Sequence, residues 1–198
     1  MDDKYSSFAE LAANEQEGVD FRIEIEPRDS PVAIIAPHGG KIEPVTTELA
    51  RLIAGDDFRF YSLIGTKDSG NRDLHITSHH FEEPQCVALV SDCRIVVAIH
   101  GRKDRQDPRS VWLGGLDRDL IARAAADLAR AGFSAKTDGH EFGALHTENI
   151  CNRGLRGKGL QIELPWILRH RFQSDTQIRD RFVASVRLSI DAQPASPD

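Results

Sequence analysis

Two histidines and one glutamate occupy positions from which they could share a metal ion. His38 and His100 each directly follow a short apolar run, and each precedes a glycine. Neighbouring parallel strands end along one edge of a sheet, so both imidazoles would meet there. Glu43 lies five residues after His38, and Gly39-Gly40 between them gives the backbone freedom to bring the carboxylate to the same ion. The spacing predicts a metal site built from His38, Glu43 and His100.

The predicted ligand set is typical of a catalytic zinc site. Two imidazoles and one carboxylate suit zinc, and three protein ligands leave a fourth position for the water that a hydrolase activates. We therefore expect one Zn²⁺ ion. The alternative is that His38 and His100 are ordinary buried histidines, and that Glu43 favours a helix amino terminus through the helix dipole.

Glu163 is the candidate general acid and base. In the segment 160–164, the two-residue period of a strand directs the apolar side chains to one face and Gln161 with Glu163 to the other. A carboxylate beside the metal can take a proton from the attacking water and return it to the leaving amine, which metal-assisted amide hydrolysis requires. The alternative is an exposed glutamate at a sheet edge.

Asn152 and Arg153 are candidates for binding the substrate. They lie in a predicted loop, where an amide and a guanidinium could hold a substrate carboxylate through paired hydrogen bonds. A solvated turn is the alternative. We expect this pair to contact an anionic substrate.

Basic and histidine side chains gather near the predicted metal site. Arg102 follows the predicted ligand His100 closely and is a candidate for contact with an anionic substrate, as is His79 in the polar stretch 65–84. Polar loops carry histidines for many reasons, so the role of His79 stays open. The other basic residues of these two regions are Lys103, Arg105, Arg109, Arg156 and Lys158.

Alternating strand and helix patterns are expected to position these residues. The continuous apolar run 32–36 and the segment 94–99, which is apolar after Arg94, are typical of strands buried on both faces, and strand patterns also cover 58–64 and 160–164. Helical periodicity follows at about 45–53, 116–128 and 175–190. The alternation predicts a single-domain α/β fold over 1–192, with a mainly parallel sheet covered by helices on both faces and a flexible tail at 193–198.

Composition excludes several other classes of protein. The 198 residues carry a formal charge of −6, which argues against a nucleic-acid or membrane partner. No apolar run approaches the length of a membrane span, and no signal peptide is recognised, so we expect a cytoplasmic protein. Three cysteines without Cys-x-x-Cys spacing fit neither a disulfide framework nor a thiolate zinc site. Oligomeric state is not indicated.

Five ordered blocks of sequence resemble the phage-type poly-γ-glutamate hydrolases. They are Pro37-His-Gly-Gly-Lys-Ile-Glu43, Asp73-Leu-His-Ile-Thr-Ser78, Ala98-Ile-His-Gly101, Asn149-Ile-Cys-Asn-Arg153 and Gly159-Leu-Gln-Ile-Glu-Leu-Pro165. The resemblance implies a three-layer, zinc carboxypeptidase-like fold with a mixed sheet, one zinc ion and cleavage of γ-glutamyl amide bonds. It also implies zinc ligands at His38, Glu43 and His100, a general base at Glu163, and a carboxylate-binding pair at Asn152 and Arg153.

The leading hypothesis is therefore a zinc-dependent amidohydrolase that acts on poly-γ-glutamate or a related glutamyl compound. A hydrolase of small N-acyl amino acids, such as an N-acylated glutamate, would use the same metal and the same arginine. An alternative of another class is a phage or prophage interaction protein that keeps the metal without catalysis. Fold and site do not by themselves select a substrate.

Overall fold

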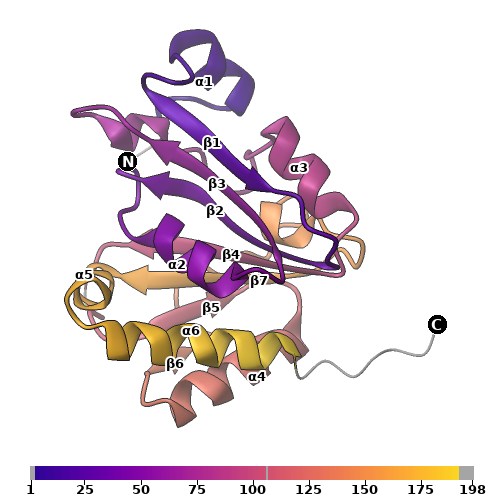
Figure 1. The fold of residues 1–198 in the computed structure, drawn as a ribbon, viewed down its shortest axis with the longest axis vertical. Helices are drawn as coiled ribbons and strands as arrows, with labels where there is room; N and C mark the ends of the chain where they lie inside the picture. The colour runs from indigo at the N-terminus through magenta and orange to yellow at the C-terminus, as the bar shows by residue number, and fades with distance from the viewer. Residues whose placement is uncertain (1–2, 106, 192–198) are drawn as a thin grey trace.

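The apolar runs expected as strands form the centre of a mixed sheet in the computed structural model, which describes residues 3–105 and 107–191 (Figure 1). In sheet order, the seven strands of the described residues are β1 (Phe21–Glu26), β3 (Arg59–Gly65), β2 (Val32–Gly40), β4 (Ile95–Arg102), β7 (Leu160–Pro165), β5 (Val111–Gly114) and β6 (Ala135–Lys136). Strands β3, β2, β4 and β7 run parallel, whereas β1 and β5 pair antiparallel with β3 and β7. The sheet is therefore mixed, with a parallel centre.

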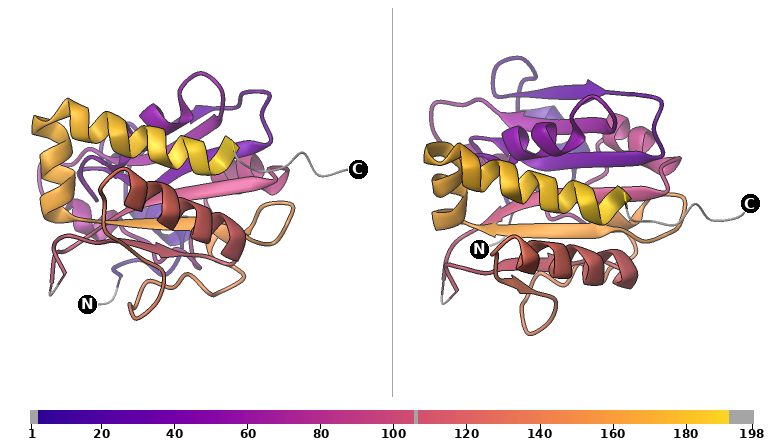
Figure 2. Two further views of the ribbon diagram at one scale, coloured as in Figure 1. Left: turned by 90° about the horizontal axis from the view of Figure 1, so that it is seen from below. Right: turned by 60° about the horizontal axis from the view of Figure 1, so that its bottom comes forward.

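Helices cover both faces of this sheet (Figure 2). One face packs against α2 (Thr46–Ala54), α4 (Arg118–Arg130), α5 (Trp166–Ser174) and α6 (Thr176–Asp191). The other packs against α1 (Phe8–Asn14), α3 (Pro84–Ser91) and the 3-10 turns η1 (Asn71–Leu74) and η2 (Ile150–Asn152). The predicted single-domain, three-layer α/β fold is confirmed.

The predicted flexible tail and the predicted absence of a membrane span can be compared with the described residues. The predicted tail, 193–198, lies outside the described residues. Among the residues that the structure describes, none of the helices combines the length and the apolar character needed to span a bilayer.

An irregularity in β2 turns His38 toward the face of the sheet that carries Glu163. Between Ala36 and Gly39, β2 contains one more residue than its partner β3. An extra residue in a strand reverses the alternation of side chains beyond it. His38 therefore lies on the same face as His100, and the Nδ1 atoms of the two rings are 3.1 Å apart. Uninterrupted alternation would have directed His38 to the opposite face, with Ala36.

The turn after β2 holds Glu43 next to the strand end. The backbone N–H of Glu43 donates to the carbonyl oxygen of His38 at 2.9 Å. Helix α2 begins at Thr46, one residue after the start expected from the periodicity at about 45–53. The cause is Val45, which adopts a left-handed conformation with φ 82°, unusual for a β-branched residue. Strain of this kind persists where the surrounding structure fixes the backbone, as it does beside functional groups.

Glu15 ties the amino-terminal segment to the edge of the sheet. Its carboxylate accepts hydrogen bonds from Tyr5 Oη at 2.6 Å, from Lys67 Nζ at 2.6 Å and from Lys4 Nζ at 3.2 Å. Burial acts to raise the pKa of Glu15, but these three partners outweigh it and lower the pKa to about 2. The ionised carboxylate thus stabilises the fold and holds the segment that contains Asp3.

We expect Glu15→Gln to lower the free energy of unfolding at pH 7 by about 1–2 kcal/mol, the usual effect of losing hydrogen bonds to a charged group. The folded pKa of about 2 lies below the unfolded value of 4.5, so the stabilisation is present above pH 4.5 and is lost as pH falls toward 2. Urea unfolding between pH 7 and pH 3 measures this difference, with the exposed Glu17→Gln as control. A difference that stays constant over this range would contradict the role given to the Glu15 charge.

Candidate active site

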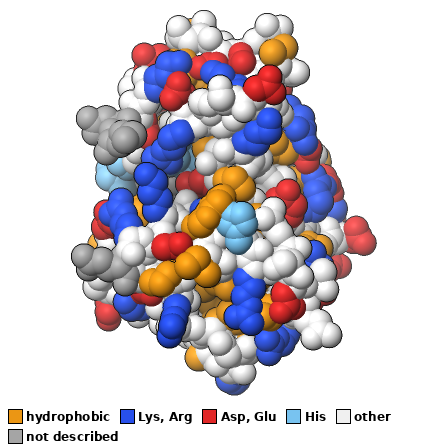
Figure 3. Space-filling view, turned by 90° about the vertical axis from the view of Figure 1, so that its left-hand side faces the viewer, with side chains coloured by type: hydrophobic (Ala, Val, Ile, Leu, Met, Phe, Trp, Pro, Cys, Tyr) orange, Lys and Arg blue, Asp and Glu red, His pale blue; other side chains and the backbone are white. Residues whose placement is uncertain are grey.

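A cavity of about 640 Å³ opens at the carboxyl ends of β2, β4 and β7. Figure 3 shows the face of the molecule toward which the arrowheads of these strands point in Figure 1. Lys and Arg side chains gather there beside histidine and carboxylate groups. The edge of the parallel strands is therefore both hollowed and rich in titratable side chains.

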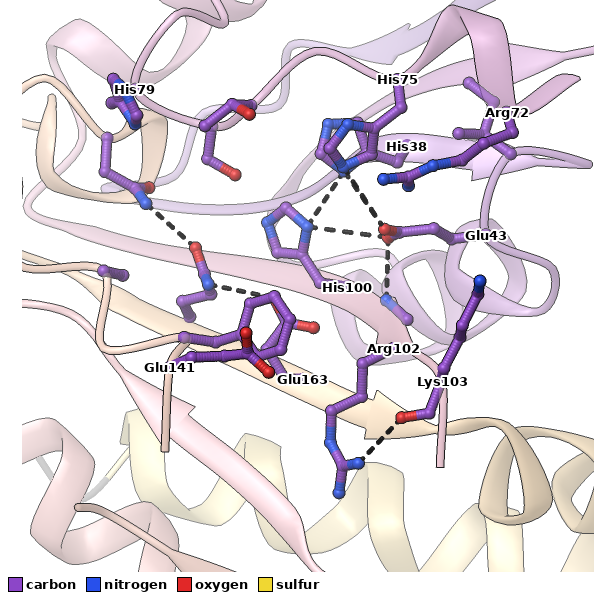
Figure 4. A pocket seen from close by; sticks show the side chains of 18 of the residues that line it. His38, Glu43, Arg72, His75, His79, His100, Arg102, Lys103, Glu141 and Glu163 are labelled. Atoms are coloured by element: carbon purple, nitrogen blue, oxygen red, sulfur yellow. Dashed lines mark hydrogen bonds and ion pairs between the residues drawn. The ribbon is translucent and has the colours of Figure 1, made fainter. Parts of the chain in front are cut away.

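His38, Glu43 and His100 meet at the floor of this cavity (Figure 4). Glu43 Oε1 lies 3.5 Å from His38 Nδ1, and Glu43 Oε2 lies 3.6 Å from His100 Nδ1. His38 Nε2 donates to the carbonyl oxygen of Ile76 at 2.7 Å, so in the neutral ring the lone pair on Nδ1 points into the cluster. All three side chains are buried.

The geometry of this cluster fits a metal ion. Zinc binds imidazole nitrogen and carboxylate oxygen at about 2.0–2.2 Å, so two ligands of one ion lie at most about 4.4 Å apart. The three separations, 3.1, 3.5 and 3.6 Å, are all within this limit. Burial acts to raise the pKa of Glu43, but the charge on His38 and hydrogen bonding with His100 hold it well below its usual range. An ionised carboxylate and two imidazoles form a donor set that zinc prefers.

His75 lies next to two members of this cluster, His38 and Glu43. A coordinating atom from each of His38, Glu43 and His75 lies within 4.8 Å of the other two. The His75 ring packs on the His38 ring with 4.0 Å between centroids. His75 lies in the polar stretch 65–84, and its contact with His38 depends on how that stretch folds back over β2.

Glu163 lies beside His100 on the neighbouring strand. The two residues are in register between β4 and β7, which directs both side chains to the same face of the sheet. Glu163 lines the cavity and is only 4% exposed. Burial raises the pKa of Glu163 well above its usual range, and the negative charge of Glu43 adds to this effect. The alternative of an exposed glutamate at a sheet edge is wrong, since β7 is an interior strand.

A chain of hydrogen bonds orients the Glu163 carboxylate. The backbone N–H of Cys151 can only donate, and it donates to Asn149 Oδ1. Asn149 Nδ2 must then face Gln161 Oε1, at 3.0 Å, and Gln161 Nε2 donates to Glu163 Oε1 at 3.0 Å. The polarity of the whole chain is thus set by one backbone group. Strand alternation places Gln161 on the site face, but the contact with Asn149 is not visible in the sequence.

Arg102 lines the cavity, but its guanidinium does not face the metal cluster (Figure 4). It donates to the carbonyl oxygens of Asp107 and Ser110, each at 2.7 Å, and lies 3.6 Å above the ring of Trp112. Its hydrogen bonds therefore anchor the loop after β4. The predicted contact between Arg102 and substrate stays a prediction, and the guanidinium is engaged with the protein backbone.

The structure does not bring Asn152 and Arg153 to the cavity. Asn152 Nδ2 donates to the carbonyl oxygens of Ala144 and His146, and Asn152 Oδ1 accepts from two backbone N–H groups. Arg153 Nη1 donates to the carbonyl oxygen of Phe81 at 3.4 Å. Neither residue lines the cavity. Asn152 thus fastens loops and Arg153 contacts the backbone of Phe81, so the carboxylate clamp stays a prediction that the geometry of the cavity does not support.

Other cationic side chains do line the cavity. Arg72 and Lys103 are exposed at its mouth, while Arg105 pairs with Glu141. Arg156 and Lys158, by contrast, pair with Asp117 at the start of α4. His79 lines the cavity and stacks on His146, with 4.9 Å between ring centroids.

Arg169 is a buried arginine of the site that the sequence did not indicate. It extends from α5 and donates to the carbonyl oxygen of Pro44 at 2.7 Å, next to Glu43. Its positive charge counteracts the effect of burial on the pKa of Glu163. Its position depends on α5, a helix that was not predicted.

The mixed sheet, with a histidine and glutamate cluster at the ends of its parallel strands, defines an α/β protein of the zinc carboxypeptidase-like class. Residues 5–188 match the family described as poly-gamma-glutamate hydrolase. The chain belongs to this family and is a hydrolase of it.

Individual relatives agree with this assignment. The Bacillus subtilis protein YmaC is 36% identical over 90% of this chain and 76% of its own length. The structure of a bacteriophage poly-gamma-glutamate hydrolase superposes with a TM-score of 0.91 at 30% identity, covering 96% of this chain and 97% of that one. A structure described as zinc-free apo YndL gives a TM-score of 0.87 at 28% identity, covering 96% and 98%. This chain spans 58% to 76% of the length of three Bacillus subtilis relatives.

Proposed function

We propose that this chain is a zinc-dependent amidohydrolase that cleaves γ-glutamyl amide bonds in poly-γ-glutamate or a related glutamyl compound. The observation that supports this most is the meeting of Glu163 with the cluster of His38, Glu43 and His100 in one cavity. These three residues would hold the metal, which when bound supplies a Lewis acid that polarises the carbonyl of the scissile amide. The substrate is proposed from the family and from the bacteriophage relative.

Glu163 is the proposed general base and then the general acid. Its carboxylate takes a proton from the attacking water as the new C–O bond forms, and it gives this proton to the amine nitrogen as the C–N bond breaks. A raised pKa makes the carboxylate a stronger base than an exposed glutamate. The hydrogen bond from Gln161 holds Oε1, which leaves Oε2 for the proton that is transferred.

Arg72 and Lys103 are the proposed binding groups for glutamyl carboxylates. Both line the cavity, both are exposed, and both lie near Glu43 in Figure 4. They take the role that the sequence assigned to Asn152 and Arg153. Exposed charges act over a short range in salt, so this binding should weaken as ionic strength rises.

Three substrates separate the proposal from its alternatives. Zinc-loaded protein is incubated with poly-γ-glutamate, with α-linked polyglutamate and with N-formylglutamate, and new amino groups and polymer length are measured. We expect shortening of the γ-linked polymer alone. Cleavage of N-formylglutamate without shortening of the polymer would identify a small-amide hydrolase, and release of no amine from any substrate would favour the non-catalytic alternative.

A further inference from the structure

The guanidinium of Arg169 donates to three backbone segments of the candidate active site. Arg169 extends from α5 and is only 4% exposed. Nη1 donates to the carbonyl oxygen of Pro44 at 2.7 Å, Nη2 to that of Arg102 at 3.2 Å and Nε to that of Leu164 at 3.2 Å. One planar, rigid group thus joins the turn after β2 to the ends of β4 and β7.

The three acceptors lie one or two residues after functional side chains. These side chains are Glu43 in the turn 41–45, His100 in β4 and Glu163 in β7. The sheet already joins β4 to β7, because His100 and Glu163 are in register. The turn 41–45 lies outside the sheet, so its position depends more strongly on the hydrogen bond from Arg169.

Gly101 allows the guanidinium to lie against the backbone next to His100. A Cβ atom at Gly101 would lie 2.5 Å from Cζ of Arg169, 2.7 Å from Nε and 2.8 Å from Nη1, which is too close for any real contact. The backbone N–H of Gly101 also donates to Glu43 Oε2 at 2.8 Å. The close approach of Arg169 therefore accounts for the glycine that follows His100.

The contacts of Arg169 are those of a group that holds the backbone. A guanidinium binds a substrate carboxylate best through two parallel hydrogen bonds. Arg169 instead uses Nη1 and Nη2 on two separate carbonyl oxygens, and it is buried, whereas Arg72 and Lys103 are exposed at the mouth of the cavity.

We propose that Arg169 is a positioning residue, which holds the turn 41–45 against the ends of β4 and β7 and thereby fixes Glu43 relative to His100 and Glu163. This inference rests on the proposed zinc site and on the proposed reaction. Metal binding and proton transfer both depend on geometry, and a displacement of about 1 Å can reduce a rate by about 10²-fold.

Amide hydrogen exchange of metal-stripped protein tests this positioning without zinc or substrate. In Arg169→Met, which removes the donors, we expect the N–H groups of Glu43 and Gly101 to exchange about 10-fold faster, because loosening of the turn breaks their hydrogen bonds. The exposed Arg171→Met on the same helix is the matched control and should exchange like the intact protein. Unchanged exchange of Glu43 in folded Arg169→Met would overturn the proposal.

Arg169→Lys separates the geometry of the side chain from its charge. Lysine keeps the charge but lacks the planar fork that reaches three carbonyl oxygens. We expect kcat on poly-γ-glutamate to fall and the zinc Kd to rise, each by about 10–100-fold, with little change in KM. An unchanged kcat and Kd would overturn the positioning role. A higher KM with unchanged kcat would identify a substrate-binding group and would also contradict it.

Gly101→Ala displaces the guanidinium while Arg169 stays in the sequence. Its methyl group should lower kcat and raise the zinc Kd in the intact background. In the Arg169→Met background it should add little, because methionine is flexible and can move away from the methyl group. Equal effects in both backgrounds would show that Gly101 acts independently of Arg169, and would contradict the contact on which the inference depends.

These measurements distinguish the role of Arg169 from the proposed function. Faster exchange in Arg169→Met, in a protein that binds no zinc, would support the positioning of the turn and contradict the proposed metal site. Faster exchange with a raised zinc Kd, but no γ-glutamyl hydrolysis by the intact protein, would contradict only the proposed reaction. Hydrolysis by a zinc-loaded intact protein, with unchanged exchange in Arg169→Met, would contradict only the role of Arg169.

Discussion

Glu163→Gln is expected to reduce the hydrolysis of poly-γ-glutamate by about 10²–10⁴-fold, the usual contribution of a general acid and base. Glutamine has nearly the same shape as glutamate, but its amide cannot accept the proton of the attacking water. Its oxygen can still accept the hydrogen bond that Gln161 donates, so the local structure should be preserved. The variant should therefore fold, bind zinc and fail at the proton transfer.

The decisive measurement is kcat at saturating substrate, made together with the zinc content of the same sample. Glu141→Gln is the matched control, because Glu141 lines the same cavity but pairs with Arg105 at the surface. It should retain hydrolysis. Full activity in a zinc-containing Glu163→Gln sample would exclude Glu163 as the general base.

Replacing His100 with glutamine is expected to remove both metal binding and activity. His100 Nδ1 lies within 3.1 Å of His38 Nδ1 and 3.6 Å of Glu43 Oε2, so its loss opens the cluster. Loss of a residue that merely supports a ligand typically weakens metal affinity by about 10–100-fold, and loss of a ligand itself should exceed this. Zinc content after dialysis and the Kd from chelator competition measure the effect.

The exposed His170→Ala on α5 is the control, because it removes a histidine away from the cavity. It should bind one equivalent of zinc. If His100→Gln bound zinc as tightly as the control, His100 would not be a ligand, and the metal would have to be held by the remaining residues of the cluster.

The elements with strong hydrophobic periodicity could be predicted from the sequence. Strands β2 and β4 contain continuous apolar runs, β7 alternates apolar and polar residues, and α4 and α6 have clear apolar stripes, so their patterns indicate their type. Strand β5 and helix α5 are short and were not predicted. Strand β5 has only four residues, which is too short for a clear periodic pattern. Helix α5 follows β7 without a loop, so no turn residues mark its start.

The site could be predicted in part, and for identifiable reasons. His38, Glu43, His100 and Glu163 follow or occupy apolar strands, which is why their meeting in one cavity was foreseen. The extra residue in β2 that turns His38 to the site face was not foreseen, because it appears only in the pairing with β3.

Asn152 is a residue whose role could not be predicted from the sequence. Its residue type and loop position are those of a binding group, yet its amide is fully used in fastening backbone segments. Residue type cannot distinguish these roles, because both depend on hydrogen-bond partners that are distant in the sequence.

A zinc titration of metal-stripped protein, made while the shortening of poly-γ-glutamate is followed, shows whether hydrolysis depends on one bound zinc ion. We expect no hydrolysis without metal, a rate that rises in proportion to zinc up to one equivalent, and an inactive Glu163→Gln sample that binds the same single equivalent. Undiminished hydrolysis by the stripped protein, or a zinc-loaded protein that never shortens the polymer, would contradict zinc-dependent hydrolysis of poly-γ-glutamate by this chain.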